Sequence, residues 1–134
     1  MNRIAKAAGL LVALSLAGCG MSSMLESDRG DRGQPFPSSF KTELLAFLRT
    51  YLKDPVGVRD ASMAEPVQRT VNGQLRYVSC LKYNPRETDG SYRGVRERAV
   101  SYIDGRLDRM VDDTGDLCVG ATYTPFPELQ ILTR

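Results

Sequence analysis

The 134-residue chain contains no histidine and no tryptophan, and it has only three cysteines. Without histidine it lacks the usual base of a nucleophilic triad and the commonest side-chain ligand of transition metals. It also has no Cys-x-x-Cys pair and no Gly-x-Ser-x-Gly elbow, and the acidic run at Asp112, Asp113 and Asp116 lacks the ligand spacing of a calcium loop. We therefore expect no metal, no cofactor and no catalytic residues, and predict that the protein is not an enzyme.

The chain has no apolar run of the roughly 20 residues that a membrane-spanning helix needs. Its N-terminus instead carries Arg3 and Lys6, followed by a short apolar stretch at residues 7–16. A positive start and a short apolar core are typical of an export signal. We predict that residues 1–18 are a cleaved signal peptide.

Leu16-Ala17-Gly18-Cys19 follows this core directly. An apolar residue and two small residues ahead of a cysteine resemble the lipobox of bacterial lipoproteins. The resemblance implies that Cys19 is lipidated, carries palmitate and becomes the first residue of the mature chain; the alternative is an ordinary secretory signal with a chance cysteine. Gly20 lacks the aspartate that tends to retain enteric lipoproteins in the inner membrane, so the resemblance implies a lipid anchor on the periplasmic face of the outer membrane.

Removal of the signal changes the charge of the chain. The sequence has 18 basic and 16 acidic side chains, and loss of Arg3 and Lys6 leaves 16 of each. A formally neutral mature chain has no electrostatic footprint for nucleic acid. Residues 19–38 are rich in Gly, Ser, Pro and charge without an apolar period, so we interpret them as a flexible tether and residues 39–134 as one small periplasmic domain.

A helix is the clearest regular element of this domain. Ser39 is its expected N-cap, and apolar residues recur at helical spacing at Phe40, Leu44, Phe47, Leu48 and Tyr51. Asp54-Pro55 ends it, because proline disfavours a helical conformation at the preceding residue. The stripe favours packing against a core, and the alternative is a helix that binds a partner or lies on a membrane.

The remainder has the alternation and turns of β structure. Residues 67–71 and 75–83 flank Asn72-Gly73, and residues 95–103 and 107–111 flank Asp104-Gly105, so each pair predicts a hairpin. A further short strand is expected at residues 117–123. The fold class is therefore α+β, with one N-terminal amphipathic helix packed on a small antiparallel sheet of about four strands.

Cys80 and Cys118 remain once Cys19 is assigned to lipid. In an oxidising compartment they are expected to form a disulfide, which would add roughly 2–4 kcal/mol of stability. Two buried free thiols are the alternative, since the sequence does not fix their separation.

Three short segments carry a second resemblance: residues 54–59 (DPVGVR), residues 80–84 (CLKYN) and residues 90–94 (GSYRG). They are similar to motifs of small Gram-negative envelope proteins that have no assigned activity. The chain departs from that pattern at Gly57, where serine is common, and at Pro85-Arg86 after the asparagine. The resemblance implies residence in the envelope and no catalytic residues.

The loop between the two predicted hairpins and the start of the strand that follows it are rich in basic residues. Its candidate binding residues are Arg86, Tyr92, Arg93, Arg96 and Arg98, a set suited to an anionic partner such as peptidoglycan, lipid headgroups or a protein. The alternative is a solvated loop whose arginines are neutralised by Glu87, Asp89 and Glu97. Near the C-terminus, Phe126, Leu129, Ile131 and Leu132 are expected to close the core.

Three functions follow as hypotheses. The first is a membrane-anchored, non-enzymatic binding or structural component of the cell envelope, with an envelope protein or peptidoglycan as its partner. The second is an inhibitor of a wall-degrading enzyme such as lysozyme, because Gly90-Ser91-Tyr92 loosely resembles the loop that such inhibitors insert. The third is a small hydrolase that uses paired carboxylates.

Overall fold

The computed structural model describes residues 33–134, so the predicted signal peptide, Cys19 and most of the tether lie outside the described residues. One helix, α2 (Phe40–Tyr51), precedes an antiparallel six-stranded sheet, and a short helix, α3 (Pro127–Gln130), follows it. The strands are β1 (Arg59–Met63), β2 (Val67–Val71), β3 (Gln74–Asn84), β4 (Arg96–Ile103), β5 (Arg106–Val111) and β6 (Thr124–Pro125). No helix within residues 33–134 is long and apolar enough to cross a membrane.

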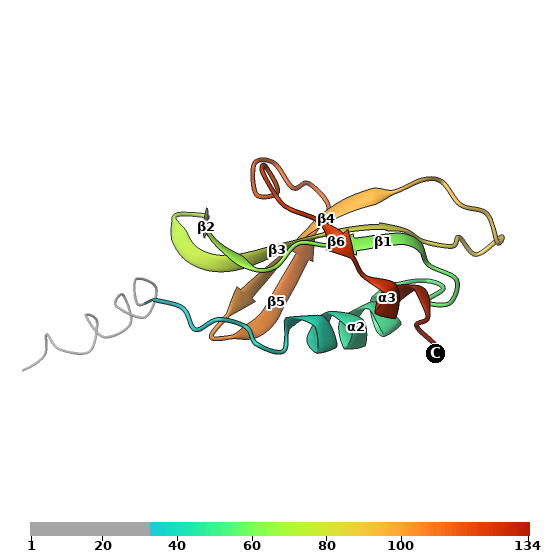
Figure 1. Cartoon of the computed structure of the whole chain (residues 1–134), viewed down its shortest axis with the longest axis horizontal. Helices are drawn as coiled ribbons and strands as arrows, with labels where there is room; N and C mark the ends of the chain where they lie inside the picture. The colour runs from blue at the N-terminus through green and yellow to red at the C-terminus, as the bar shows by residue number, and fades with distance from the viewer. Residues whose placement is uncertain (1–32) are drawn as a thin grey trace, which may run out of the picture.

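The sheet is built around β3, its longest strand. The strand order is β5-β4-β3-β1-β6. Strands β1 and β2 lie on the same edge of β3, where β2 pairs with the N-terminal half of β3 and β1 with its C-terminal half. Helices α2 and α3 lie on one face of the sheet, and the connection from β5 to β6 crosses the other face (Figure 1). The α+β class is therefore confirmed, but the sheet has more strands than the expected four, and helix is not confined to the N-terminal side.

The expected helix forms with its apolar stripe against the sheet. Leu44 and Leu48 are fully buried, and Phe47 packs beside them. Ser39 does not act as a side-chain cap, because its backbone does not adopt the extended conformation from which a cap residue reaches the first turn. Glu43 instead fixes the helix to β5, where its carboxylate accepts a 2.7 Å hydrogen bond from the backbone N–H of Leu107.

Both hairpins form at the expected turns. Asn72-Gly73 and Asp104-Gly105 all have positive φ, the backbone conformation that a tight two-residue hairpin requires. The strand expected at residues 117–123 is wrong, because Leu117–Gly120 form consecutive turns and the only pairing in this part is the two-residue β6 against β1. Strand β1 was not expected, since a register shift between Arg59 and Ser62 interrupts its alternation.

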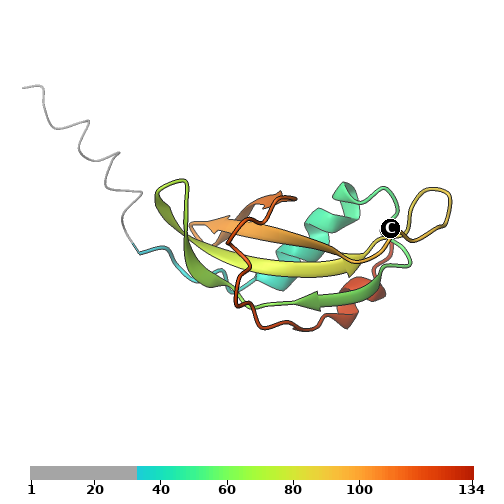
Figure 2. The same ribbon diagram turned by 90° about the horizontal axis from the view of Figure 1, so that it is seen from above.

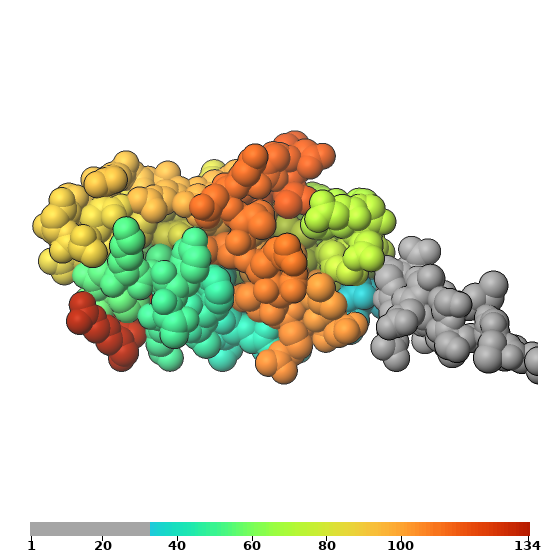
Figure 3. Space-filling model, turned by 180° about the vertical axis from the view of Figure 1, so that it is seen from behind, coloured from blue at the N-terminus to red at the C-terminus, as the bar shows by residue number. Residues whose placement is uncertain are grey.

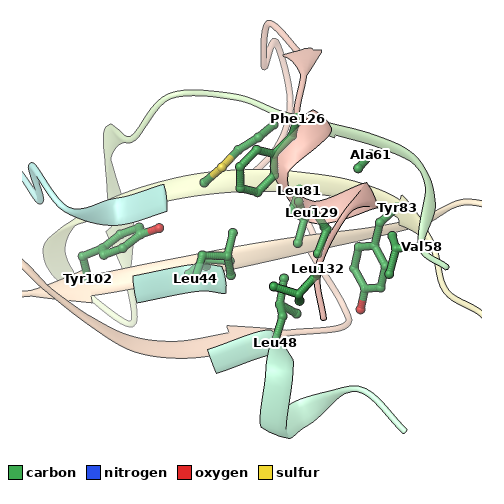
Figure 4. Close-up of a cluster of buried hydrophobic side chains, with 12 residues drawn as sticks. Leu44, Leu48, Val58, Ala61, Leu81, Tyr83, Tyr102, Phe126, Leu129 and Leu132 are labelled. Atoms are coloured by element: carbon green, nitrogen blue, oxygen red, sulfur yellow. The ribbon is translucent and has the colours of Figure 1, made fainter. Parts of the chain in front are cut away.

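The two faces of β3 belong to two separate cores. On the helix face, Leu81 and Tyr83 pack against Leu44, Leu48 and the C-terminal residues (Figure 4). The opposite face holds a smaller cluster around Cys80 and Cys118, which form the expected disulfide. The disulfide therefore lies in the smaller of the two hydrophobic cores.

The two ends of the domain depart from expectation. Gln34 and Pro37, assigned to the tether, are buried, and the Gln34 side chain accepts a 2.8 Å hydrogen bond from the Asp104 N–H, so the folded part begins before residue 39. At the C-terminus Phe126, Leu129 and Leu132 close the core as expected. Ile131 does not, because its side chain, just after the end of α3, is 77% exposed.

Candidate functional site

A pocket of about 250 Å³ lies where α2 ends against the connection from β3 to β4. We call it the basic pocket. Its charged lining residues are Lys53, Asp54, Arg86, Glu87, Arg93, Arg96 and Arg98, and Tyr51 and Tyr83 contribute aromatic surface. Figure 3 shows the end of α2 and this connection side by side at one end of the molecule. Four of the five residues predicted as a binding surface therefore line one pocket.

The register of β3 and β4 explains why two of these arginines face the helix. Arg96 lies opposite Tyr83, and Arg98 lies opposite Leu81, so both arginines share the helix face of the sheet with core residues. Further along β4 the same face carries the buried residues Val100 and Tyr102. The arginines stand where α2 stops covering the sheet, and their half-buried stems extend the core while their guanidinium groups reach the pocket.

Two of the cations in the pocket are paired with carboxylates. Arg96 Nη2 lies 2.5 Å from Glu87 Oε1. Arg98 Nε lies 2.8 Å from Asp112 Oδ1, although the carboxylate is out of line with the N–H and makes no hydrogen bond with it. Both arginines are thus held in place rather than free in solvent.

The other cations of the pocket form no ion pair within residues 33–134. Among the described residues, Lys53, Arg86 and Arg93 have no carboxylate within ion-pair distance. The pocket thus has five cationic side chains against two carboxylates, Asp54 and Glu87. Asp54 is itself engaged, since it accepts a 3.1 Å hydrogen bond from the Val56 N–H and lies 3.7 Å from Arg134. The pocket has a positive excess with free guanidinium groups at its rim.

Tyr83 gives the pocket a neutral hydroxyl. Burial raises the pKa of its phenol above the ordinary value, and Arg98 opposes this only in part. The hydroxyl therefore stays protonated at neutral pH and is able to donate a hydrogen bond to an anionic oxygen.

Tyr92, the fifth predicted residue, does not line the pocket and has a structural role. Its hydroxyl donates a 2.5 Å hydrogen bond to the Gly57 carbonyl, and the Arg59 guanidinium lies 3.9 Å from the ring centroid. Gly57 has φ +81°, and a Cβ there would lie 3.1 Å from the Tyr92 hydroxyl. Glycine suits this position because the chain needs both a positive φ and room for the Tyr92 hydroxyl.

The three segments that carry the resemblance to envelope proteins lie together at this end of the domain. Arg59 pairs with Asn84 across β1 and β3, and Asn84 Oδ1 accepts a 3.2 Å hydrogen bond from the Gly94 N–H. Arg86 and Tyr92 form a bridge that closes the intervening loop. The segments thus build the wall beside the basic pocket.

Sequence reasoning missed Lys53, which reaches the pocket from the far end of α2. Only the tertiary structure places it beside Arg93, since the two are far apart in the sequence. Within residues 33–134 no three Asp, Glu or Cys side chains gather in an arrangement that could hold a metal ion. No protein-family model, curated protein or solved structure matches this chain.

Proposed function

We propose that this chain is a lipid-anchored, non-enzymatic component of the cell envelope that binds an anionic group in the basic pocket. The observation that carries the proposal is the gathering of five cationic side chains around a hollow of about 250 Å³. Guanidinium groups match carboxylate and phosphate oxygens in a two-point geometry, and a concave site excludes part of the competing water.

The state of the individual arginines supports a binding role. Arg96 and Arg98 are fixed by acidic partners, so they present a preorganised positive surface. Arg86 and Arg93 are exposed and unpaired among the described residues, and they therefore supply the groups that an incoming anion contacts first. Because Arg96 and Arg98 are already fixed, only Arg86 and Arg93 lose side-chain freedom when the anion binds, and this lowers the entropic cost of binding.

The position of the pocket favours the wall over the headgroups of the anchoring membrane. Residues 33–39 enter at the N-terminal end of α2, whereas the pocket lies at its C-terminal end (Figure 1). A twelve-residue helix separates the two ends by about 18 Å. The pocket thus lies at the end of the domain opposite to the one where the chain from Cys19 enters, so the peptide carboxylates of peptidoglycan or an acidic envelope protein can reach it without obstruction by the anchor.

Binding of the purified full chain to isolated peptidoglycan sacculi tests the pocket. The variant Arg86→Glu/Arg93→Glu should reduce the bound fraction at least tenfold, because both changes replace exposed cations at the rim with anions. The matched control Lys41→Glu/Arg109→Glu makes the same change of net charge at exposed positions outside the pocket and should bind within twofold of wild type. Equal binding of all three proteins would refute the pocket as the binding site.

Lipidation of Cys19 is tested separately. Cells expressing the protein should incorporate a labelled fatty acid into the wild-type chain and not into Cys19→Ser. Membrane fractionation should then recover the wild type with the outer membrane. Label retained by Cys19→Ser would show that the cysteine is not the acceptor.

The two alternative functions remain predictions. For the inhibitor, the loop residue Tyr92 is held by Gly57 and Arg59 rather than projecting freely, and full lysozyme activity in the presence of excess protein would end that idea. For the hydrolase, Asp54 and Glu87 do line the same pocket, but each lies against an arginine. Unchanged turnover of wall fragments in Asp54→Asn and Glu87→Gln would exclude it.

A further inference from the structure

Strand β2 leaves one edge of the sheet open. It pairs with β3 alone, and no other described strand lies beyond it (Figure 2). Val71 and Gln74 flank the two-residue turn and so form a hydrogen-bonded pair. Because hydrogen-bonded and non-hydrogen-bonded pairs alternate along an antiparallel ladder, the backbone N–H and C=O groups of Gln68 and Thr70 point away from β3. Outward backbone groups on an edge strand are a template for another extended chain.

A second pocket opens beside this edge, on the disulfide face of the sheet. We call it the disulfide pocket. It has a volume of about 310 Å³ and is lined chiefly by apolar residues, among them Val67, Val78, Cys80, Leu117 and Ala121. Val67, at the start of β2, is 43% exposed. The hollow is large enough for one bulky apolar side chain, and Glu65, Arg69, Thr122 and Thr124 add polar groups to its lining.

Two neighbouring arginines without an acidic partner among the described residues lie at the disulfide pocket, and Arg69 is part of its lining. Arg69 of β2 is directly opposite Arg76 of β3, on the same face as Val67 and Val78. Like charges at directly opposite positions destabilise a sheet. In the part of the chain that the structure describes, neither guanidinium has a carboxylate within ion-pair distance. Arg76 donates to the Leu75 carbonyl, and Arg69 donates a 3.2 Å hydrogen bond to the Gln68 carbonyl, a contact that it would exchange for the carboxylate of an added strand. The pair therefore offers a site for an acidic side chain.

We propose that β2 and the disulfide pocket bind an extended acidic peptide of a partner protein by strand addition. The backbone of the peptide pairs with Gln68 and Thr70, one bulky apolar side chain fills the pocket beside Val67, and a carboxylate meets Arg69 and Arg76. Backbone pairing supplies affinity, and the pocket and the arginines supply specificity.

The spacing within the peptide follows from the strand. Val67 and Arg69 are two residues apart on one face, so the apolar and acidic residues of the peptide are also two apart. Glu65 lines the pocket on the other side of Val67 and would repel a carboxylate there. The acidic residue of the peptide therefore lies on the side of Val67 that is nearer to the Asn72-Gly73 turn. This fixes the order of the apolar and acidic residues along β2.

Strand β6 already shows this kind of pairing in the molecule. Its residues Thr124 and Pro125 lie antiparallel to Met63 and Ser62 of β1, and β1 and β2 share one edge of β3. An added peptide would pair with the outer edge of β2 in the same way that β6 pairs with the outer edge of β1. The inference is independent of the basic pocket, which lies on the opposite face and uses none of these residues.

Selection of a phage-displayed library of random heptapeptides on the purified full chain tests the proposal. We expect enrichment of sequences with a bulky apolar residue and Asp or Glu two positions apart. A synthetic peptide of the enriched sequence should bind wild type in fluorescence anisotropy at least tenfold more tightly than it binds Arg69→Glu/Arg76→Glu. The control Lys41→Glu/Arg109→Glu, which makes the same change of net charge outside both pockets, should bind it as wild type does.

Backbone pairing has its own readout. N-methylation of the peptide at alternate residues should abolish binding at the positions that face β2 and leave it unchanged at the others. The amide protons of Gln68 and Thr70 should also become protected from exchange. The proposal would be overturned by the absence of an enriched pattern, by equal binding to Arg69→Glu/Arg76→Glu, or by N-methyl effects that do not alternate. The two arginines would then serve only to prevent edge-to-edge aggregation.

Discussion

Replacement of Cys80 and Cys118 by alanine should lower the free energy of unfolding by about 5 kcal/mol, of which loss of the crosslink accounts for about 4. The disulfide joins positions 38 residues apart. For a loop of that length, restriction of the unfolded chain is worth close to 4 kcal/mol on the chain-entropy estimate. A domain of this size has a total stability of roughly 5–15 kcal/mol, so the loss is a large fraction of it.

The structure indicates a further, smaller contribution from packing. Cys80 is 3% exposed and Cys118 is 8% exposed, and the cluster around them is otherwise built from small residues such as Ala64 and Ala99. Loss of two buried sulfur atoms should cost about 1 kcal/mol more, because the neighbouring side chains cannot fill the space.

Urea unfolding followed by circular dichroism separates the two contributions. Wild type under reducing conditions keeps both sulfur atoms and should lose only the crosslink term, whereas Cys80→Ala/Cys118→Ala should lose both. The reasoning would be refuted if the reduced wild type lost less than about 1 kcal/mol, or if the alanine variant were as stable as the oxidised protein.

Three further changes probe other parts of the domain. Burial raises the pKa of Tyr102 to about 12, so the unfolded state ionises first, and stability should fall by about 2 kcal/mol as the pH rises from 10 to 12; the decline should flatten in Tyr102→Phe, as measured by urea midpoints at each pH. Leu48→Ala should cost 2–5 kcal/mol because the side chain is fully buried, whereas Ile131→Ala should change stability by less than about 0.5 kcal/mol; similar losses in thermal unfolding would contradict the assignment of the core. Glu43→Ala should cost about 1–3 kcal/mol, since it removes the acceptor of the Leu107 N–H, and an unchanged Tm would show that this bond does not hold α2 to the sheet.

The basic pocket was in large part predictable from the sequence. Arg96 and Arg98 are two residues apart on a predicted strand, so they had to share a face, and Arg86 and Arg93 lie in the connection just before that strand. The sequence did not reveal which face this was. The register of β3 and β4 decided it by placing Tyr83 and Leu81 opposite the arginines, on the side that α2 covers.

The disulfide pocket and the open edge of β2 were not predictable. The pocket needs β2 and β3 beside a loop from residues 117–124, and that loop was expected to be a strand. Its path depends on the Cys80–Cys118 bond and on the burial of Phe126 after β6, both of which are contacts between distant parts of the chain. Local alternation carries no information about such contacts.

By itself the sequence determined the local structure: the helix from its 3.6-residue stripe, the two hairpins from turns that tolerate positive φ, and the absence of histidine-based chemistry. Those features depend on neighbouring residues, whose energetics are short in range. The tertiary structure alone decided the six-strand order, the division into two cores and the presence of Lys53 and Arg93 in one pocket, because each depends on which distant surfaces bury one another.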